Sequence, residues 1–289
     1  MRRQRGPKDH VIVLDDGRAL GYADLGDPDG FPVVYCHGGL SSRIDAGSAE
    51  APAAAAGLRL LAVDRPGIGL SDRHAGSGLA DWADDVAALV DLLGIEDFAA
   101  MGWSGGGSHA AALGHYLSGR VSDVVLIASV IPPDWPGMMD QTNTMDRVFL
   151  RLSGRGALVD RAAFAALGAL ATSAPAFLLA VTTRGLTPQS RAALDRDPEE
   201  FARATAEGMV NTGGVLDDYR LWHRPWGFDL RDLQLPVHLW HGREDEFCPP
   251  DWSRRMAAAI PGAVLTMVPD AGHFVARDHW VEILTAIRR

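Results

Sequence analysis

The stretch FAAMGWSGGGS at residues 98–108 indicates how this chain folds. Its first six residues form a short apolar run, and three glycines follow Ser104 before an alanine-rich segment. This pattern is typical of a buried strand that turns sharply into a helix, because only small residues fit around so tight a turn. The Gly-x-Ser-x-Gly pattern at 102–106 therefore predicts a nucleophilic Ser104 lifted clear of a sheet. A glycine-rich turn with an incidental serine is the plainer alternative.

Similar apolar runs recur along the chain and alternate with helical stretches. Strands are expected at Val11–Leu14, Arg18–Leu25, Phe31–Cys36, Leu58–Val63, Phe98–Trp103, Val124–Ala128, Val237–Trp240 and Val264–Val268. Helices are expected at Ser48–Ala56, Leu79–Leu93, Ser108–Leu117, Trp252–Ile260 and Phe274–Ile287. Continuous apolar strands that alternate with helices predict an α/β fold with a mostly parallel sheet buried on both faces. Ligands bind in such sheets beyond the carboxyl ends of the strands.

One long stretch interrupts this alternation. From Ile131 to about Leu233 no strand is expected, and helical windows occur at Arg161–Leu170, Pro175–Val181 and Pro198–Met209. The interruption predicts an inserted helical cap. We therefore expect a core formed by residues 1–130 and 233–289, with the cap at 131–232.

A serine hydroxyl needs a neighbouring base before it can act as a nucleophile. Of the ten histidines, His273 follows the last expected strand, in the sequence Asp-Ala-Gly-His-Phe. A loop at that position holds its side chain above the same sheet edge as Ser104, so His273 is the expected base. A helix-capping or surface role is the alternative. His37 and His241 also end strands, and both are interpreted as structural hydrogen-bonding groups.

The base in turn needs a carboxylate that fixes its tautomer. Asp245 lies on the loop after the expected strand at 237–240, but Glu244 and Glu246 flank it, and a solvated acidic loop is an alternative. Asp134 is a second candidate. The order Ser104, Asp245, His273 is the order Ser, Asp, His that hydrolases with a nucleophile elbow use.

Acyl transfer also needs backbone N–H donors for the oxygen that becomes negative. The residue after the nucleophile, Gly105, is one expected donor, and Gly39 in the His-Gly-Gly turn after Cys36 is the other. Large apolar side chains decorate the predicted cap, and some are expected to line a cleft over Ser104 while others form the core of the cap. Candidate substrate contacts are Trp103, Trp135 and Met138.

The composition excludes several classes of function. The net charge of −10 argues against nucleic-acid binding, which needs a basic surface. The two cysteines match no metal-ligand spacing, and no dinucleotide or phosphate-loop motif is present, so no metal and no cofactor are expected. No apolar segment is long enough to cross a membrane, and no apolar stretch follows the basic N-terminus, so a cytoplasmic protein is expected. The expected partner is a small-molecule substrate; the oligomeric state stays open.

Four segments together resemble the α/β-hydrolase family. They are His37–Gly39, Asp64–Asp72, Gly102–Gly107 and the pair His241–Pro249 with Gly272–His273. The resemblance implies an eight-stranded central sheet with a helical cap inserted after strand 6. It also implies a triad of Ser104, Asp245 and His273. The chain departs from many members by carrying Leu40-Ser41-Ser42 where a proline is common.

An ester hydrolase is the function expected from these residues. The triad predicts cleavage of a carboxylic ester of a small to medium apolar substrate through an acyl-enzyme on Ser104. Alternatives with the same triad are an enzyme similar to proline iminopeptidases, for which Glu199, Glu200 and Glu207 of the cap are available, and a carbon–carbon bond hydrolase. A non-catalytic ligand receptor on the same scaffold is a further alternative.

Overall fold

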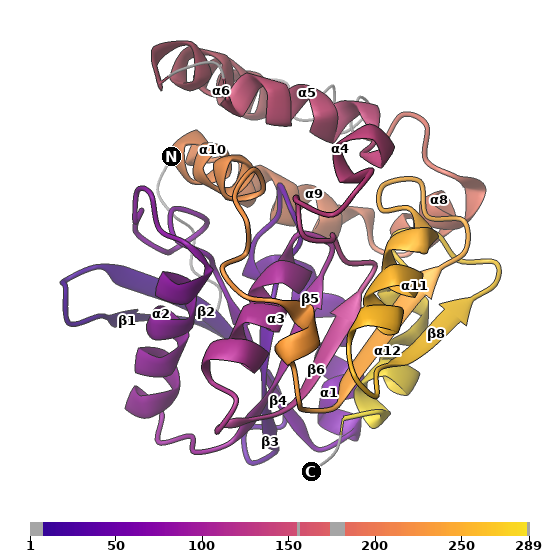
Figure 1. Ribbon diagram of the computed structural model, residues 1–289. Helices are drawn as coiled ribbons and strands as arrows, with labels where there is room; N and C mark the ends of the chain where they lie inside the picture. The colour runs from indigo at the N-terminus through magenta and orange to yellow at the C-terminus, as the bar shows by residue number, and fades with distance from the viewer. Residues whose placement is uncertain (1–7, 155–156, 174–182, 288–289) are drawn as a thin grey trace.

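Eight strands form one sheet, and the apolar runs of the sequence supply all of them (Figure 1). The computed structural model describes residues 8–154, 157–173 and 183–287. The strands are β1 (Asp9–Val13), β2 (Ala19–Gly26), β3 (Phe31–Cys36), β4 (Leu58–Val63), β5 (Phe98–Trp103), β6 (Val121–Ile127), β7 (Val237–Gly242) and β8 (Val264–Val268).

The order of the strands is β1-β2-β4-β3-β5-β6-β7-β8. β2 is antiparallel to both of its neighbours, and every other neighbouring pair is parallel. In the register of the sheet, Cys36 lies opposite Gly102 and Gly102 lies opposite Leu126. The carboxyl ends of β3, β5 and β6 are therefore level, and the loops that follow them meet at one edge. The predicted α/β fold with a mostly parallel eight-stranded sheet is confirmed.

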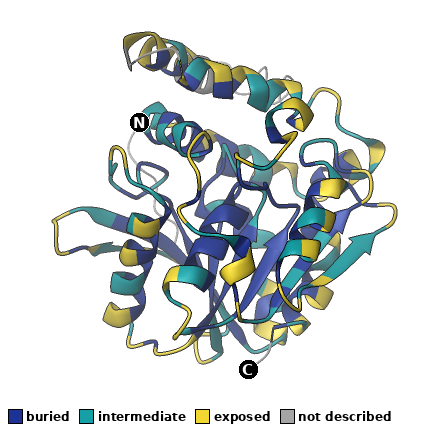
Figure 2. Cartoon of the chain, in the orientation of Figure 1, coloured by how far each residue is buried: buried dark blue, intermediate teal, exposed yellow. Residues whose placement is uncertain are grey.

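Helices cover both faces of the sheet, and the central strands are coloured mostly as buried (Figure 2). One face packs against α2 (Leu79–Leu92), α3 (Gly106–Tyr116) and α11 (Pro250–Ala259). The other packs against α1 (Glu50–Ala55) and α12 (Ala276–Thr285). Successive side chains of a strand alternate between these two layers. A strand buried on both faces is therefore apolar throughout, which is why the strands could be predicted from continuous apolar runs.

A group of helices lies between β6 and β7 in the chain, above the carboxyl ends of the strands (Figure 1). These cap helices are α4 (Met138–Gln141), α5 (Thr144–Ser153), α6 (Ala157–Ser173), α8 (Pro188–Leu194), α9 (Pro198–Gly208) and α10 (Thr212–Leu221). α5, α6 and α10 share an apolar cluster that includes Phe149, Phe164 and Tyr219. The helix expected at Pro175–Val181 lies outside the described residues.

The helix expected at Ser48–Ala56 is divided in the structure. A 3-10 helix, η1 (Arg43–Ala49), precedes α1, and a second one, η2 (Leu230–Asp232), precedes β7. η1 is ordered by buried polar side chains: Arg43 pairs with Asp64, and Asp45 accepts a hydrogen bond from the Gly38 N–H. A pattern of apolar residues carries no information on such contacts.

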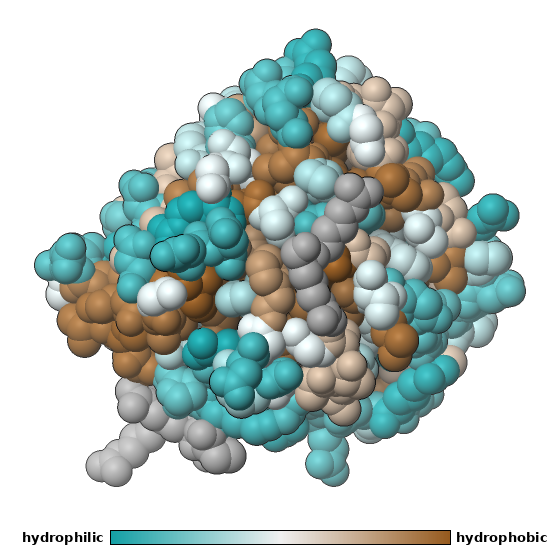
Figure 3. Space-filling view, turned by 90° about the horizontal axis from the view of Figure 1, so that it is seen from below, coloured by the Kyte–Doolittle hydropathy of each residue, from teal (hydrophilic) through white to brown (hydrophobic). Residues whose placement is uncertain are grey.

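The end of the molecule opposite the cap helices is seen in Figure 3. Hydrophilic side chains cover much of this face, with hydrophobic areas between them. Within the described residues, no helix has both the length and the apolar character that a membrane crossing requires.

Candidate active site

Ser104 sits on a strained turn between β5 and α3. Its φ of +55° lies in the left-handed region that non-glycine residues rarely adopt. The turn is closely packed, since a Cβ on Gly102 would lie 2.3 Å from the carbonyl oxygen of Gly106. A Cβ on Gly106 would in turn lie 2.1 Å from the carbonyl oxygen of Cys36. The glycines on both sides of Ser104 are thus required by backbone contacts, as expected of a nucleophile turn.

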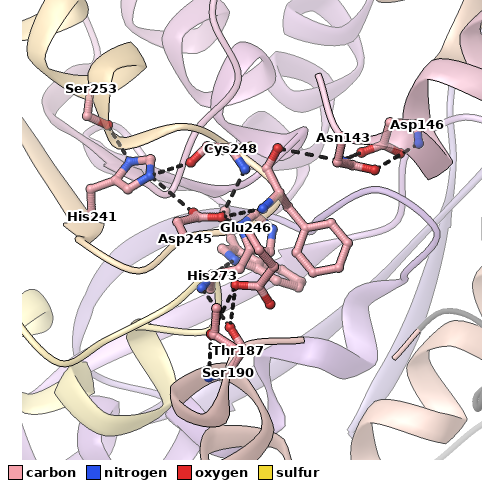
Figure 4. Close-up of polar contacts among 12 residues, drawn as sticks. Asn143, Asp146, Thr187, Ser190, His241, Asp245, Glu246, Cys248, Ser253 and His273 are labelled. Atoms are coloured by element: carbon pink, nitrogen blue, oxygen red, sulfur yellow. Dashed lines mark hydrogen bonds and ion pairs between the residues drawn. The ribbon is translucent and has the colours of Figure 1, made fainter. Parts of the chain in front are cut away.

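His273 and Asp245 form a buried pair at the same edge of the sheet. His273 Nδ1 lies 2.9 Å from Asp245 Oδ2 and 3.1 Å from Oδ1. The carboxylate also accepts the backbone N–H groups of Phe247, at 2.8 Å, and Cys248, at 2.9 Å (Figure 4). Because a carboxylate only accepts, Nδ1 carries the proton. Nε2, on the far side of the ring, is left as the basic nitrogen.

The two partners shift each other's pKa. Burial alone would raise the pKa of Asp245, but the charge of His273 and the hydrogen bonds from His241 and His273 hold it well below its usual value. Burial alone would lower the pKa of His273, but the charge and the hydrogen bond of Asp245 raise it above the ordinary 6.5. Asp245 therefore favours the protonated imidazole that forms when a base accepts a proton.

A second histidine, His241, contacts the same carboxylate. His241 Nε2 lies 3.1 Å from Asp245 Oδ2 and 2.8 Å from the carbonyl oxygen of Cys248, and its Nδ1 lies 2.6 Å from Ser253 Oγ (Figure 4). Both groups near Nε2 are acceptors, so Nε2 donates and Nδ1 accepts from the Ser253 hydroxyl. His241 is thus a buried structural hydrogen-bonding group that orients Asp245.

The alternative acids lie elsewhere. Glu246 accepts hydrogen bonds from the hydroxyls of Ser190, at 2.9 Å, and Thr187, at 3.3 Å. Glu244 and Asp134 are exposed. Of the four carboxylates considered from the sequence, Asp245 is the one that is hydrogen-bonded to His273.

Ser104 and His273 line one cleft between the sheet edge and the cap helices. The space in this cleft that no atom fills is about 660 Å³, including the part that is open to solvent. The cleft is lined by Gly39, Leu40, Ser41, Trp103, Ser104, Met145, Asp146, Thr183, Leu186, Leu194, Phe201, Thr205, Trp222, Phe247, His273 and Phe274.

The Ser104 hydroxyl also lies beside the Cys248 thiol. Burial raises the pKa of that thiol well above its ordinary value, and the hydrogen bond with Ser104 offsets only part of this rise. Cys248 is therefore a neutral neighbour of the serine.

The two expected oxyanion donors both lie against one tryptophan ring. Gly39 follows β3, and Gly105 precedes α3. A Cβ on Gly39 would lie 2.7 Å from the ring of Trp222, and a Cβ on Gly105 would lie 2.2 Å from it. The absence of side chains at both positions lets this ring of the cap close over the backbone next to Ser104. Trp222 is one of the large apolar cap side chains of which some were expected in the cleft, and it lines the cleft, although it was not among the candidate substrate contacts.

The turn that carries Gly39 is held by buried charged groups. Arg65 donates to the carbonyl oxygens of His37 and of Gly38, the latter at 3.0 Å, and pairs with Asp218 of α10 at 2.8 Å. On the other side, Asp45 accepts the Gly38 N–H at 3.2 Å. Burial raises the pKa of Asp45 to about 6, against the opposing effect of its hydrogen bonds.

The expected substrate contacts are divided between two places. Trp103 lines the cleft, and its indole N–H donates to the carbonyl oxygen of His273 at 3.1 Å. Trp135 and Met138 pack instead against the core beside α11, and Arg255 stacks over the Trp135 ring at 5.2 Å. Neither of these two is among the described residues that line the cleft. Phe247, two residues after Asp245, and Phe274, next to His273, line it as well.

Known proteins with similar sequences and structures agree with this architecture. A non-heme chloroperoxidase of Streptomyces lividans is 36% identical over 124 residues, a match that covers 42% of this chain and 45% of that protein. A non-heme haloperoxidase of Rhodococcus erythropolis is 27% identical over 269 residues, 91% of this chain and 92% of that protein. The structure of a thermophilic esterase from Thermogutta terrifontis is 23% identical, with a TM-score of 0.71 over 97% of this chain and 96% of that one.

The profile of a protein family gives the broader assignment. The family described as alpha/beta hydrolase fold matches residues 32–279. This range contains Ser104, Asp245 and His273, together with the cap helices. The chain belongs to the α/β hydrolase fold family.

Proposed function

We propose that the chain is a serine hydrolase that cleaves a carboxylic ester of a small to medium apolar substrate through an acyl-enzyme on Ser104. The observation that carries this proposal is that His273 lines the same cleft as Ser104 and is hydrogen-bonded to the buried Asp245. The largely apolar lining of the cleft supports an apolar substrate.

In this mechanism the Ser104 oxygen attacks the ester carbonyl carbon while its proton passes to His273 Nε2. The carbonyl electrons move to the carbonyl oxygen, which is stabilised by the N–H groups of Gly39 and Gly105 at the positive end of α3. The tetrahedral adduct then expels the alcohol, which takes the proton from His273 as it leaves. Asp245 stabilises the charged imidazole throughout.

Water completes the cycle. His273, now neutral, removes a proton from a water molecule, whose oxygen attacks the acyl carbon and forms a second tetrahedral adduct. Collapse of this adduct breaks the bond to Ser104, which regains its proton from His273, and the carboxylic acid departs. No cofactor takes part in this sequence of steps.

An iminopeptidase would use cap carboxylates to bind a substrate ammonium, but the glutamates considered for this role are engaged elsewhere. Glu200 pairs with Arg277 at 2.9 Å, and Glu207 pairs with Arg43 at 2.5 Å. Glu199 is exposed at the start of α9. None of these three glutamates is among the described residues that line the cleft, so they give an iminopeptidase no support.

The proposal is tested with p-nitrophenyl esters of increasing acyl length and with labelling by a fluorophosphonate. We expect Ser104→Ala to lower kcat/KM by about 10³-fold or more and to abolish labelling. Ser118→Ala, at an exposed position just beyond the other end of α3, is the matched control and should behave as wild type. Wild-type protein that is folded but neither turns over any ester nor becomes labelled would rule the proposal out.

A further inference from the structure

The cleft over Ser104 carries an acidic side chain that is paired with no lysine or arginine among the described residues of its lining. Asp146, near the start of α5, lines the cleft together with Ser104 and His273. Among the described residues of its lining there is neither lysine nor arginine. A ligand that enters the cleft therefore meets a negative potential on the cap side.

Neutral groups hold Asp146 in place. The Tyr219 hydroxyl donates to Oδ1 at 2.6 Å. The Asn143 amide donates to Oδ2 at 2.6 Å (Figure 4). Asn143 Oδ1 accepts the Asp146 N–H at 3.0 Å. Asn143 Nδ2 donates to the carbonyl oxygen of Phe247, on the loop of Asp245, at 3.5 Å. The carboxylate is thus fixed relative to the triad, and its charge is not neutralised by these donors.

Five other cap carboxylates that are buried or half-buried each have an arginine partner: Asp160 with Arg220, Glu200 with Arg277, Glu207 with Arg43, Asp217 with Arg73 and Asp218 with Arg65. Asp146 has no such partner among the described residues, although it faces a cavity that is largely apolar. An acidic group left without a counter-ion in an enclosed site favours the binding of a cation.

The field of Asp146 extends to the reacting groups. Burial would lower the pKa of His273, but Asp245 raises it, and Glu246 and Asp146 add to this effect. Asp146 therefore acts electrostatically on His273, and both side chains line the same cleft as Ser104.

Aromatic rings form much of the remaining wall. Trp103, Phe201, Trp222, Phe247 and Phe274 contribute from both the core and the cap. The faces of such rings attract cations, most strongly where water is excluded. We propose that, among small to medium esters that are otherwise apolar, the cleft selects those that carry a substituted ammonium group, bound by Asp146 and these rings. This inference rests on ester hydrolysis at Ser104 as the proposed function.

The test compares two esters of equal shape, butyrylcholine and 3,3-dimethylbutyl butyrate, by acid release at constant pH. Wild type should have a kcat/KM about tenfold higher for the cationic ester, mainly through a lower KM. Asp146→Asn should bring the ratio of the two esters close to one. Asp140→Asn, at an exposed position on α4, removes the same charge outside the cleft and should keep the wild-type ratio. A wild-type ratio of one or less overturns the inference.

Binding to the Ser104→Ala variant separates this inference from the proposed function. In calorimetric titrations, choline should bind about tenfold more tightly than 3,3-dimethylbutanol, and added salt should weaken choline alone. Ser104-dependent turnover of the neutral ester without any preference for choline would leave ester hydrolysis standing and reject the cation site. Preferential choline binding without turnover of either ester would support the site and reject ester hydrolysis.

Discussion

At the scale of single residues, the acid of the proposed triad contacts several other groups of the candidate site. Asp245 accepts hydrogen bonds from His273 and His241 and from two backbone N–H groups of its own loop. Four donors around one buried carboxylate fix both its position and its charge. The orientation of the proposed base, His273, therefore depends on the hydrogen bonds that hold Asp245.

Replacing Asp245 by asparagine should change the pH dependence as well as the rate. The pKa of His273 is raised, so wild-type kcat/KM is expected to fall with decreasing pH through a midpoint above 6.5. In Asp245→Asn the charge that raises this pKa is gone, so the midpoint should move to lower pH, and the maximal kcat/KM should fall by about 10³- to 10⁴-fold. Profiles of kcat/KM from pH 5 to 9 test this.

Glu244→Gln is the matched control, because Glu244 lies on the same loop with its side chain exposed. It should keep the wild-type profile. An Asp245→Asn profile with an unchanged midpoint would show that Asp245 does not set the pKa of the base.

The sequence predicted the positions of some candidate site residues better than those of others. Asp245 and His273 were found from their positions after strands, because chain order and sheet topology bring such loops together. Trp135 and Met138 were expected in the cleft, but they pack beside α11. A pattern of apolar residues shows that a helix has a buried face and does not show whether that face meets the core or a cavity.

At the scale of elements, the turn between β5 and α3 depends on contacts between backbone atoms. A Cβ at residue 102 would lie 2.3 Å from the Gly106 carbonyl oxygen, which cannot move without displacing the first turn of α3. Gly102→Ala should therefore lower the free energy of unfolding by about 1–3 kcal/mol and reduce ester turnover together with it. Urea denaturation and p-nitrophenyl ester assays measure both effects.

Gly119→Ala provides the comparison, because nothing lies within 4 Å of the added Cβ there. Its unfolding free energy should stay within about 0.5 kcal/mol of wild type. Equal stability and turnover of the two alanine variants would contradict the close packing of the turn.

The helices were less predictable than the strands. α2 and α3 follow an apolar pattern and were expected almost over their whole lengths. In the cap, α4, α5, α8 and α10 were not expected. Polar side chains define their beginnings: Asn143 caps α5, Thr187 caps α8 and Asn211 caps α10. Their apolar faces become visible only through packing on other helices.

At the scale of the whole molecule, arginine–carboxylate pairs connect the cap helices to the core. Arg43 reaches Glu207, Arg65 reaches Asp218, and Arg277 reaches Glu200. All three arginines are buried or nearly so. Each pair must offset the loss of hydration that both charges suffer, so the attachment of the cap depends on the protonation of its carboxylates.

Glu200 makes this dependence measurable. Burial raises its pKa from 4.5 to about 7, against the lowering effect of Arg277. A carboxyl group whose pKa is raised in the folded state stabilises the fold at low pH and loses that contribution as pH rises from 4.5 to about 7. Glu200→Gln resembles the protonated form at every pH. The free energy of unfolding of Glu200→Gln should therefore increase relative to that of wild type as the pH rises from 5 to 8.

Urea denaturation at pH 5, 6, 7 and 8 gives this difference directly. Glu199→Gln removes a neighbouring carboxylate that is exposed on α9, and its stability should run parallel to wild type over the whole range. If Glu200→Gln instead lost stability relative to wild type as the pH rose, attraction to Arg277 would outweigh the burial of the carboxylate. The ionised pair would then stabilise the contact between α9 and α12, and the cap would be held more firmly at alkaline pH.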